Sequence, residues 1–129
     1  MSTAVVILNW NGRRLLEQFL PSVIRFSEGA NIYVADNAST DDSVVFVQEN
    51  FPQVKIIQNK ENGGFAKGYN DALSGLTEDI FVLLNSDVEV SKNWLEPILE
   101  IFKNQPKTAT VQPKILDYKR KNYFIFLKH

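Results

Sequence analysis

The chain of 129 residues contains no cysteine, and its single histidine is the last residue. Without cysteine there is no disulfide framework, no thiolate zinc site and no cysteine nucleophile. The position of His129 at the very end of the chain argues against most histidine-based catalysis and metal binding. These two absences exclude most enzymes built on a thiol or an imidazole.

Long hydrophobic runs and an excess of charge are also missing. No apolar run approaches the ~18 to 20 residues of a membrane-spanning helix, and residues 1–4 do not resemble a signal peptide. Fourteen basic and fifteen acidic residues give a net charge of −1, so no global field favours nucleic acid. We expect one soluble domain over residues 1–129, in the cytoplasm or at the inner face of the membrane, with no nucleic-acid partner and no transmembrane segment.

The sequence does contain a regular alternation of strand and helix patterns. Short apolar runs predict strands at 4–8, 31–35, 54–57, 80–84 and 109–112, the third of them near an edge of the sheet. Apolar residues at helical spacing lie between these runs. The alternation predicts an α/β fold, with a mostly parallel, Rossmann-like sheet and helices on both faces.

Capping and breaking residues predict where these helices begin and bend. Pro21 predicts a kink or two short helices in the first helical segment. The polar residues 38–42 predict the start of the second helix, with a hydroxyl cap and acids in its first turn. Ser91 predicts the start of the last helix.

The apolar run 80–84 is the strand around which we expect the rest of the chain to be arranged. Its continuous hydrophobicity predicts burial on both faces of a parallel sheet. The run stops at Asn85-Ser86-Asp87, at the carboxyl end of the strand, which is the edge where open α/β sheets bind ligands. We predict that Asp87 holds a metal ion that carries phosphates.

Polar groups also follow the first two strands. Asp36 is placed to accept hydrogen bonds from a ribose hydroxyl or a base imide, or else it serves the turn that it begins. Asn9 and Asn11 could read a base or sugar, with the indole of Trp10 as a flat wall. The alternative is that Trp10 belongs to the core and Asn11 to a turn.

A glycine pair precedes the third helix. Asn62, Gly63 and Gly64 could lay backbone amides and a positive helix end against a diphosphate. The pair matches neither GxGxxG nor GxxxxGK[ST], so a plain turn leading into a helix stays open. Lys67 fits a solvated helix face better than a phosphate contact.

Four motifs in order give the chain a family resemblance over about residues 3–116. The motifs are Val6–Gly12, Val34–Asp41, Asn62–Asn70 and Leu83–Val88. They resemble the nucleotide-sugar half of the family 2 glycosyltransferases, which have the GT-A fold, and in particular the rhamnosyltransferase-like branch of polysaccharide and cell-envelope synthesis.

The resemblance implies a site and a reaction. It implies an inverting transfer from a nucleotide-diphospho-sugar donor to a glycan or lipid-linked acceptor, with Mg²⁺ or Mn²⁺ as cofactor. In it, Asp36 contacts the nucleobase, Asn85 lies near the ribose, and Asp87 ligates the metal. The nucleotide-sugar-binding residues would be Asn9, Asn11, Asp36, Asn62, Gly63, Gly64, Asn85, Ser86 and Asp87.

Two departures from the family pattern qualify these expectations. Asn85 stands where the family's Asp-x-Asp begins with an aspartate, so one carboxylate is left for the metal, and binding without donor should be weak. Family domains are also longer. We therefore expect a C-terminally truncated domain with an atypical tail at 117–129, a general base in the missing half, unknown catalytic residues, and weak nucleotide binding with little or no transfer by this chain alone.

Three other functions are alternatives to a glycosyltransferase. A degenerate, non-catalytic nucleotide-binding or partner-binding module would self-associate through an exposed C-terminal flank that includes the apolar run 123–127. A phospho-acceptor receiver domain needs acids after the first strand and an aspartate after the third, and the chain has Asn9 and Asn59 there. A nicotinamide dehydrogenase needs a glycine fingerprint after the first strand, where only Gly12 is present.

Overall fold

A computed structural model describes residues 1–105 as a parallel four-stranded sheet with helices on both faces. The strands are β1 (Thr3–Asn9), β2 (Asn31–Asp36), β3 (Lys55–Gln58) and β4 (Ile80–Asn85), in the spatial order β3-β2-β1-β4. The helices are α1 (Arg13–Phe26), α2 (Ser43–Asn50), α3 (Phe65–Leu73) and α4 (Glu96–Asn104). The predicted α/β, Rossmann-like fold class is confirmed.

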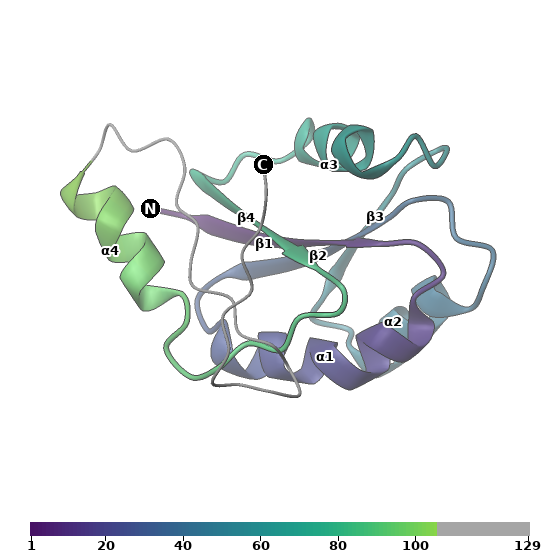
Figure 1. The fold of residues 1–129 in the computed structure, drawn as a ribbon, viewed down its shortest axis with the longest axis horizontal. Coiled ribbons are helices and arrows are strands. Elements are labelled where there is room, and N and C mark those ends of the chain that lie inside the picture. The colour runs from purple at the N-terminus through teal and green to yellow at the C-terminus, as the bar shows by residue number, and fades with distance from the viewer. Residues whose placement is uncertain (106–129) are drawn as a thin grey trace, which may run out of the picture.

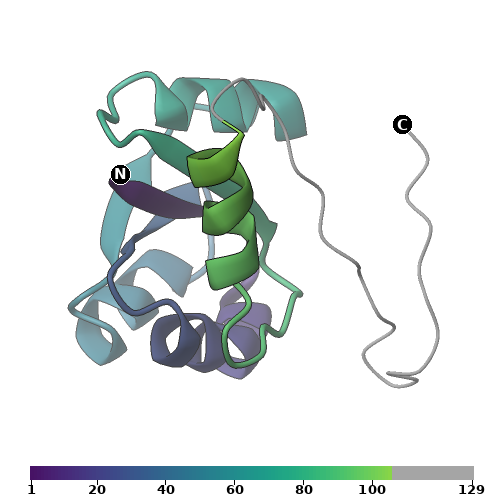
Figure 2. The same ribbon diagram turned by 90° about the vertical axis from the view of Figure 1, so that its left-hand side faces the viewer.

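Each face of the sheet has its own core, because side chains along a strand point alternately to opposite faces. Val5 and Ile7 of β1 face one side and pack with Leu16 and Leu20 of α1. Ala4 and Val6 face the other side, where Tyr69 and Ala72 of α3 cover them. Figure 2 shows these layers, with α3 on one face and α1 and α2 on the other.

The position of β4 differs from the prediction. Among residues 1–105, β4 is an edge strand paired only with β1, not a central strand buried on both faces. Phe81 and Leu83 pair with Ala4 and Val6 and share their face, yet they are 38% and 47% exposed. The helix on this face, α3, packs mainly against β1 and β2. Within residues 1–105 it reaches β4 through the Tyr69 hydroxyl at Leu84 O but does not bury Phe81 and Leu83. A continuous apolar run therefore did not distinguish a central strand from an edge strand.

Two predicted helix starts were wrong, and so was one alternative for Pro21. Pro21 does not divide α1 into two short helices; α1 is one continuous helix, and Pro21 is exposed, so the helix accommodates its ring at the solvent side. Helix α2 begins at Ser43 instead of in the segment 38–42, where Ala38 has a left-handed φ of 62°. Helix α4 begins at Glu96 instead of Ser91, because Asn93 also has a φ of 62° and interrupts the helical path.

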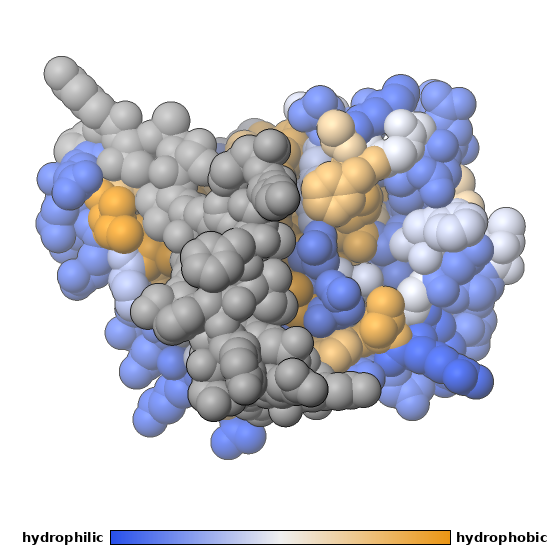
Figure 3. All heavy atoms as spheres, in the orientation of Figure 1, coloured by the Kyte–Doolittle hydropathy of each residue, from blue (hydrophilic) through white to orange (hydrophobic). Residues whose placement is uncertain are grey.

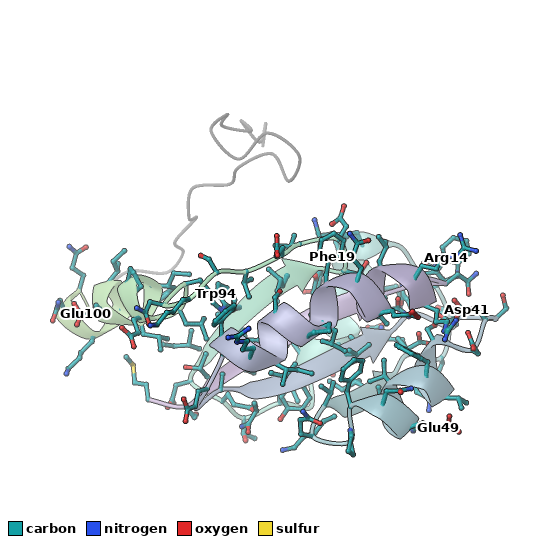
Figure 4. The ribbon with its side chains drawn as sticks, turned by 90° about the horizontal axis from the view of Figure 1, so that it is seen from below. Arg14, Phe19, Asp41, Glu49, Trp94 and Glu100 are labelled. Atoms are coloured by element: carbon teal, nitrogen blue, oxygen red, sulfur yellow. The ribbon has the colours of Figure 1, made fainter. Side chains whose placement is uncertain are left out.

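The loop before α4 is held against the end of α1. The indole Nε1 of Trp94 donates a hydrogen bond of 3.1 Å to Ser27 Oγ, and Val90 N donates one of 3.2 Å to Ser22 Oγ. In Figure 4, Trp94 lies beside α1 at the end of the molecule opposite Arg14 and Asp41. These contacts fix the direction in which the chain leaves the end of β4.

The predicted strand at 109–112 and the tail at 117–129 lie outside the described residues. No helix within residues 1–105 is long and apolar enough to cross a membrane.

Candidate functional site

The four parallel strands bring the predicted site residues to one edge of the sheet. In the strand register, Asn9 of β1 lies beside Asp36 of β2, and Leu8 lies beside Asn85 of β4. The loops after these strands and the turn before α3 lie at the same end of the molecule (Figure 1). The expected convergence of polar loops at the carboxyl ends of the strands is therefore present.

Asp36 is the centre of a buried hydrogen-bond network and is only 3% exposed. Its Oδ1 accepts from Asn9 Nδ2 at 2.9 Å and from Ser39 Oγ at 2.6 Å, and its Oδ2 accepts from Ser39 N at 3.0 Å. The amide of Asn9, 1% exposed, also donates to Ser43 Oγ at 3.0 Å, while its oxygen accepts from Gly12 N at 3.2 Å. In this structure both side chains lie under the loops and hold them together.

Asn11 and Trp10 form the outer part of the first loop. Asn11 has a left-handed φ of 50°, and its Oδ1 accepts from Thr40 N at 2.7 Å and from Asp41 N at 3.2 Å. It thus fastens the loop after β1 to the loop after β2. Trp10 is 58% exposed, so the alternative that it belongs to the core is wrong. Its indole is free to form a flat wall at this edge.

Hydrogen bonds also lower the pKa of Asp41, in the loop after β2. Asp41 accepts from the backbone amide and the hydroxyl of Ser43. Partial desolvation raises the pKa of Asp41, but the hydrogen bonds from Ser43, together with those from backbone amides such as that of Arg13, lower it by more, so the net shift of the pKa is downward. The carboxylate therefore stays ionised beside the start of α2.

The glycine turn before α3 is held by three asparagine side chains. Asn37 Nδ2 donates to Asn62 Oδ1 at 2.9 Å and to Gly64 O at 3.3 Å. Asn62 Oδ1 in turn accepts from Gly64 N at 3.0 Å, and Asn59 Nδ2 donates to Asn37 Oδ1 at 3.1 Å. Gly64 has a φ of 95°, a conformation that favours glycine.

The end of β4 is open by comparison. Asn85 and Asp87 are exposed and Ser86 is half-buried, and within residues 1–105 no side chain forms a hydrogen bond or ion pair with any of the three. Behind them, Tyr69 of α3 donates from its hydroxyl to Leu84 O at 2.9 Å. Burial raises the pKa of Tyr69 to about 12, so this hydroxyl keeps its proton.

The residues present suit a divalent cation only if a ligand completes its coordination. The described part of the chain contains no group of three acidic or histidine side chains able to hold a metal. Asp87 offers one exposed carboxylate. Mg²⁺ in phosphate sites uses one or two carboxylates together with phosphate oxygens and water. The donor set therefore fits a metal ion that arrives with a diphosphate.

Two basic side chains near this edge, Lys67 and Arg13, have acidic neighbours. Lys67 Nζ lies 2.6 Å from Asp71 Oδ2 and 3.7 Å from Glu61 Oε1, as expected for a solvated helix face. Arg13 Nε lies 3.6 Å from Asp42 Oδ2, and its guanidinium lies over the ring of Phe46 at 4.6 Å. Exposed pairs of this kind are weak, so they can exchange partners at little cost.

Figure 3 shows that the strand-end side of the molecule is mostly hydrophilic, with apolar side chains between α3 and the loop after β4. The exposed apolar residues of α3 and β4 are Phe65, Phe81 and Leu83. A separate hollow of about 450 Å³ lies at the opposite edge, between the end of α1 and the start of α4. It contains none of the predicted site residues.

The sequence interpretation missed several residues that build the site. Ser39, Ser43, Asn37 and Asn59 supply most of the buried contacts described above. The predicted residues Asn9, Asp36 and Asn62 are their partners. The only available signal was the density of asparagine and serine after strand ends, since such side chains commonly bond to nearby backbone and side-chain groups.

Comparison with known proteins identifies the family. A sequence model described as Glycosyl transferase family 2 matches residues 4–128. The chain belongs to this family. The resemblance to family 2 glycosyltransferases that the four sequence motifs indicated is confirmed.

This family 2 chain is similar to parts of much longer curated proteins. It is 37% identical over 83 residues to polypeptide N-acetylgalactosaminyltransferase 11 of Xenopus tropicalis, which covers 60% of this chain and 14% of that protein. It is 24% identical over 125 residues to N-acetylglucosaminyl-diphospho-decaprenol L-rhamnosyltransferase of Mycobacterium tuberculosis, covering 88% of this chain and 41% of that protein. The chain spans less than half the length of these relatives.

Solved structures of glycosyltransferases share the fold. S. aureus TarS 1–349 matches with a TM-score of 0.71 and 21% identity, covering 82% of this chain and 33% of that one; the same protein was also solved with UDP-GlcNAc. The mannosyltransferase PcManGT of Pyrobaculum calidifontis, in complex with GDP-Man and Mn²⁺, matches with a TM-score of 0.61 and 25% identity, covering 67% of this chain and 28% of that one. The GT-A fold that the motifs implied is confirmed.

Proposed function

We propose that this family 2 domain binds a nucleotide-diphospho-sugar at the carboxyl edge of its sheet and forms the donor half of an inverting glycosyltransferase of polysaccharide or cell-envelope glycan synthesis. The observation that carries the proposal is the exposed Asp87 carboxylate at the end of β4, which has no partner in the described part of the chain and lies on the same edge as the glycine turn before α3. The rhamnosyltransferase relative and the donor complexes of TarS and PcManGT support it.

In this proposal Asp87 would hold Mg²⁺ or Mn²⁺ together with the diphosphate. The bound ion would supply charge stabilisation to the leaving nucleoside diphosphate. Asn85, in place of a second aspartate, leaves the ion with a single carboxylate from this loop, so metal affinity should depend on the donor. Asn85 and Ser86 would lie beside the ribose and phosphates.

The loops after β1 and β2 would form the nucleobase side of the site. Asn9 and Asp36 shape this side from below, since their polar atoms bond to the loops themselves. Asn11 would line the pocket beside the exposed indole of Trp10. A direct contact between Asp36 and the base remains a prediction, and it requires the loop at 38–42 to open, because Asp36 is buried.

The diphosphate would lie against the turn formed by Asn62, Gly63 and Gly64. The first amides of α3 point out of the helix end unpaired by a side-chain cap. Helix amino ends of this kind attract anions. No residue among 1–105 is proposed as the general base, which we place outside the described part of the chain.

A second candidate function is a degenerate, non-catalytic module that binds a nucleotide or a protein partner. The single carboxylate at the end of β4 favours it. The two proposals share the nucleotide site and differ in whether sugar transfer occurs when an acceptor is supplied.

Calorimetric titration of the full chain with UDP, GDP and dTDP, with and without Mn²⁺, tests the proposal. We expect Mn²⁺-dependent binding of one of the three, abolished by Asp87→Ala. Glu100→Ala is the matched control, since Glu100 is an exposed acid of α4 at the opposite end of the molecule (Figure 4). Absence of binding by all three nucleotides, to a chain shown by circular dichroism to be folded, would refute the proposed function.

A further inference from the structure

Asn37 was not among the predicted site residues, yet it connects the end of β2 to the glycine turn. Its side chain is 2% exposed. Its backbone amide donates to Asn9 O at 2.8 Å, which continues the pairing of β1 and β2 by one residue. The position of Asn37 is therefore fixed by the sheet itself.

From this fixed position, the side chain of Asn37 contacts both ends of the turn. Nδ2 donates to Asn62 Oδ1 at 2.9 Å and to Gly64 O at 3.3 Å. Oδ1 accepts from Asn59 Nδ2, which also donates to Gly68 O at 3.0 Å. One side-chain amide thus spans residues that lie 22 to 27 positions later in the chain.

Close packing brings α3 against the same side chain. A Cβ on Gly68 would lie 2.9 Å from Leu8 Cδ1 and 3.1 Å from the Asn37 amide atoms. A helix residue with a side chain could not approach the strand ends so closely. Gly68 and Asn37 together set the distance between the first turn of α3 and the end of β2.

We infer that Asn37 is a positioning residue for the proposed donor site: it holds the turn 62–64 and the amino end of α3 at the edge where the diphosphate would bind. The part of this inference that concerns diphosphate binding rests on the proposed function. The part that says Asn37 holds the turn 62–64 does not. Asn37 would affect diphosphate binding indirectly, by holding the turn 62–64, because its buried side-chain amide is already hydrogen-bonded to that turn.

Asn37 can be replaced without leaving its buried partners unsatisfied. In Asn37→Ala, Asn59 Nδ2 keeps Gly68 O and Asn62 Oδ1 keeps Gly64 N as partners. Gly64 is exposed, so its carbonyl can bond to water. We therefore expect the variant to fold, with a turn that is no longer tied to the sheet.

A second variant separates the role of the Asn37 Nδ2 donor from that of its Oδ1 acceptor. Asn37→Asp keeps an oxygen for Asn59 but loses the donor, and it places a carboxylate against Asn62 Oδ1 and Gly64 O. It should release the turn as the alanine variant does. The matched control is Asn50→Ala, because Asn50 Nδ2 also donates to a backbone carbonyl, Phe46 O at 2.9 Å, but on α2.

The experiment combines hydrogen exchange without ligand and nucleotide titration with Mn²⁺ on the full chain. We expect both Asn37 variants to exchange the amides of Gly64 and Gly68 faster than wild type, while β1 amides are unchanged, and to bind the nucleotide at least about tenfold more weakly. Asn50→Ala should match wild type in both readouts. Unchanged exchange at Gly64 and Gly68 in both variants would overturn the inference, and so would wild-type affinity in both.

Failure of the proposed function is distinguishable from failure of the inference. If the wild-type chain binds no nucleotide, the donor-site role is lost, while exchange at Gly64 and Gly68 still tests whether Asn37 holds the turn. If wild type binds and the variants exchange faster but bind equally well, Asn37 has only a structural role, and the inference is wrong.

Discussion

The side-chain amide of Asn9 donates a hydrogen bond of 2.9 Å to the Asp36 carboxylate and so joins the ends of β1 and β2 beneath the candidate site. Both groups are buried, and each has a further partner, Ser39, in the loop that follows β2. Asp87, the other acid of the predicted site, is exposed at the end of β4 and has no hydrogen-bond or ion-pair partner among residues 1–105. The two aspartates should therefore respond differently to the same substitution.

Asp36→Asn should lower the free energy of unfolding by about 2–3 kcal/mol, because an NH₂ group would face a donor where a carboxylate oxygen accepts. Urea unfolding followed by circular dichroism measures the change. Asp87→Asn is the control and should stay within about 0.5 kcal/mol of wild type. Equal effects of the two substitutions would contradict the buried network described for Asp36.

Tyr69→Phe should lower the free energy of unfolding by about 1 kcal/mol. The Tyr69 hydroxyl donates to Leu84 O in a buried contact between α3 and β4, and its loss leaves that carbonyl without this donor. Urea unfolding measures the stability, and hydrogen exchange in β4 reports the local effect. Wild-type stability in this variant would show that the contact does not support the end of β4.

Ala38→Gly should raise the free energy of unfolding by about 0.5–1 kcal/mol. The φ of 62° at Ala38 costs a residue with a Cβ about 1–2 kcal/mol. Glycine removes that strain but loses about 0.5–1 kcal/mol through its unfolded-state entropy. Ala66→Gly, in the first turn of α3, should change the stability in the opposite direction. A loss of stability in Ala38→Gly would contradict the described loop conformation.

Glu78 should make the fold less stable in acid. The hydrogen bond from Tyr33, at 2.6 Å, lowers the pKa of Glu78 below 4.5 in the folded chain. A carboxyl with a lowered folded pKa stabilises the fold above its unfolded pKa, and this contribution is lost as the pH falls through the folded value. Glu78 is half-buried and still partly screened by water, so the effect should be modest.

Glu78→Gln keeps an oxygen acceptor for Tyr33 but does not titrate. The difference in unfolding free energy between wild type and this variant should be constant above about pH 5 and should decrease below pH 4.5. Urea unfolding at several pH values measures this difference. A difference that does not change with pH would show that the contact between Glu78 and Tyr33 has no influence on the protonation of the carboxyl.

Much of the fold could be predicted because the signals were local. The apolar runs that became β1, β2 and β3 each lie between turn residues, and the spacing between them leaves room for one helix. The position of β4 at the edge of the sheet that residues 1–105 form could not be predicted, since the run Ile80–Leu84 has the same composition as a central strand. Whether a helix buries Phe81 and Leu83 depends on packing between elements, which the composition of a single run does not determine.

The residues of the candidate site likewise fall into those that the sequence could predict and those that it could not. Residues at strand ends, such as Asn9 and Asp87, were predictable because parallel strands present their carboxyl ends together. The buried role of Asp36 and the contribution of Asn37 were not, because their partners lie up to 27 residues away. The start of α2 was missed because Asn11 accepts from the amides of residues 40 and 41, which the prediction had assigned to the first helical turn.

The central claim is that Asp87 holds a divalent ion only together with a nucleoside diphosphate. Electron paramagnetic resonance of Mn²⁺, titrated with the full chain in the presence and absence of UDP, GDP or dTDP, tests it most directly. We expect the signal of free Mn²⁺ to fall with wild type only when one of these nucleotides is present, and Asp87→Asn to leave it at the level set by the nucleotide alone. A fall with wild type in the absence of every nucleotide, or the same fall with Asp87→Asn, would contradict it.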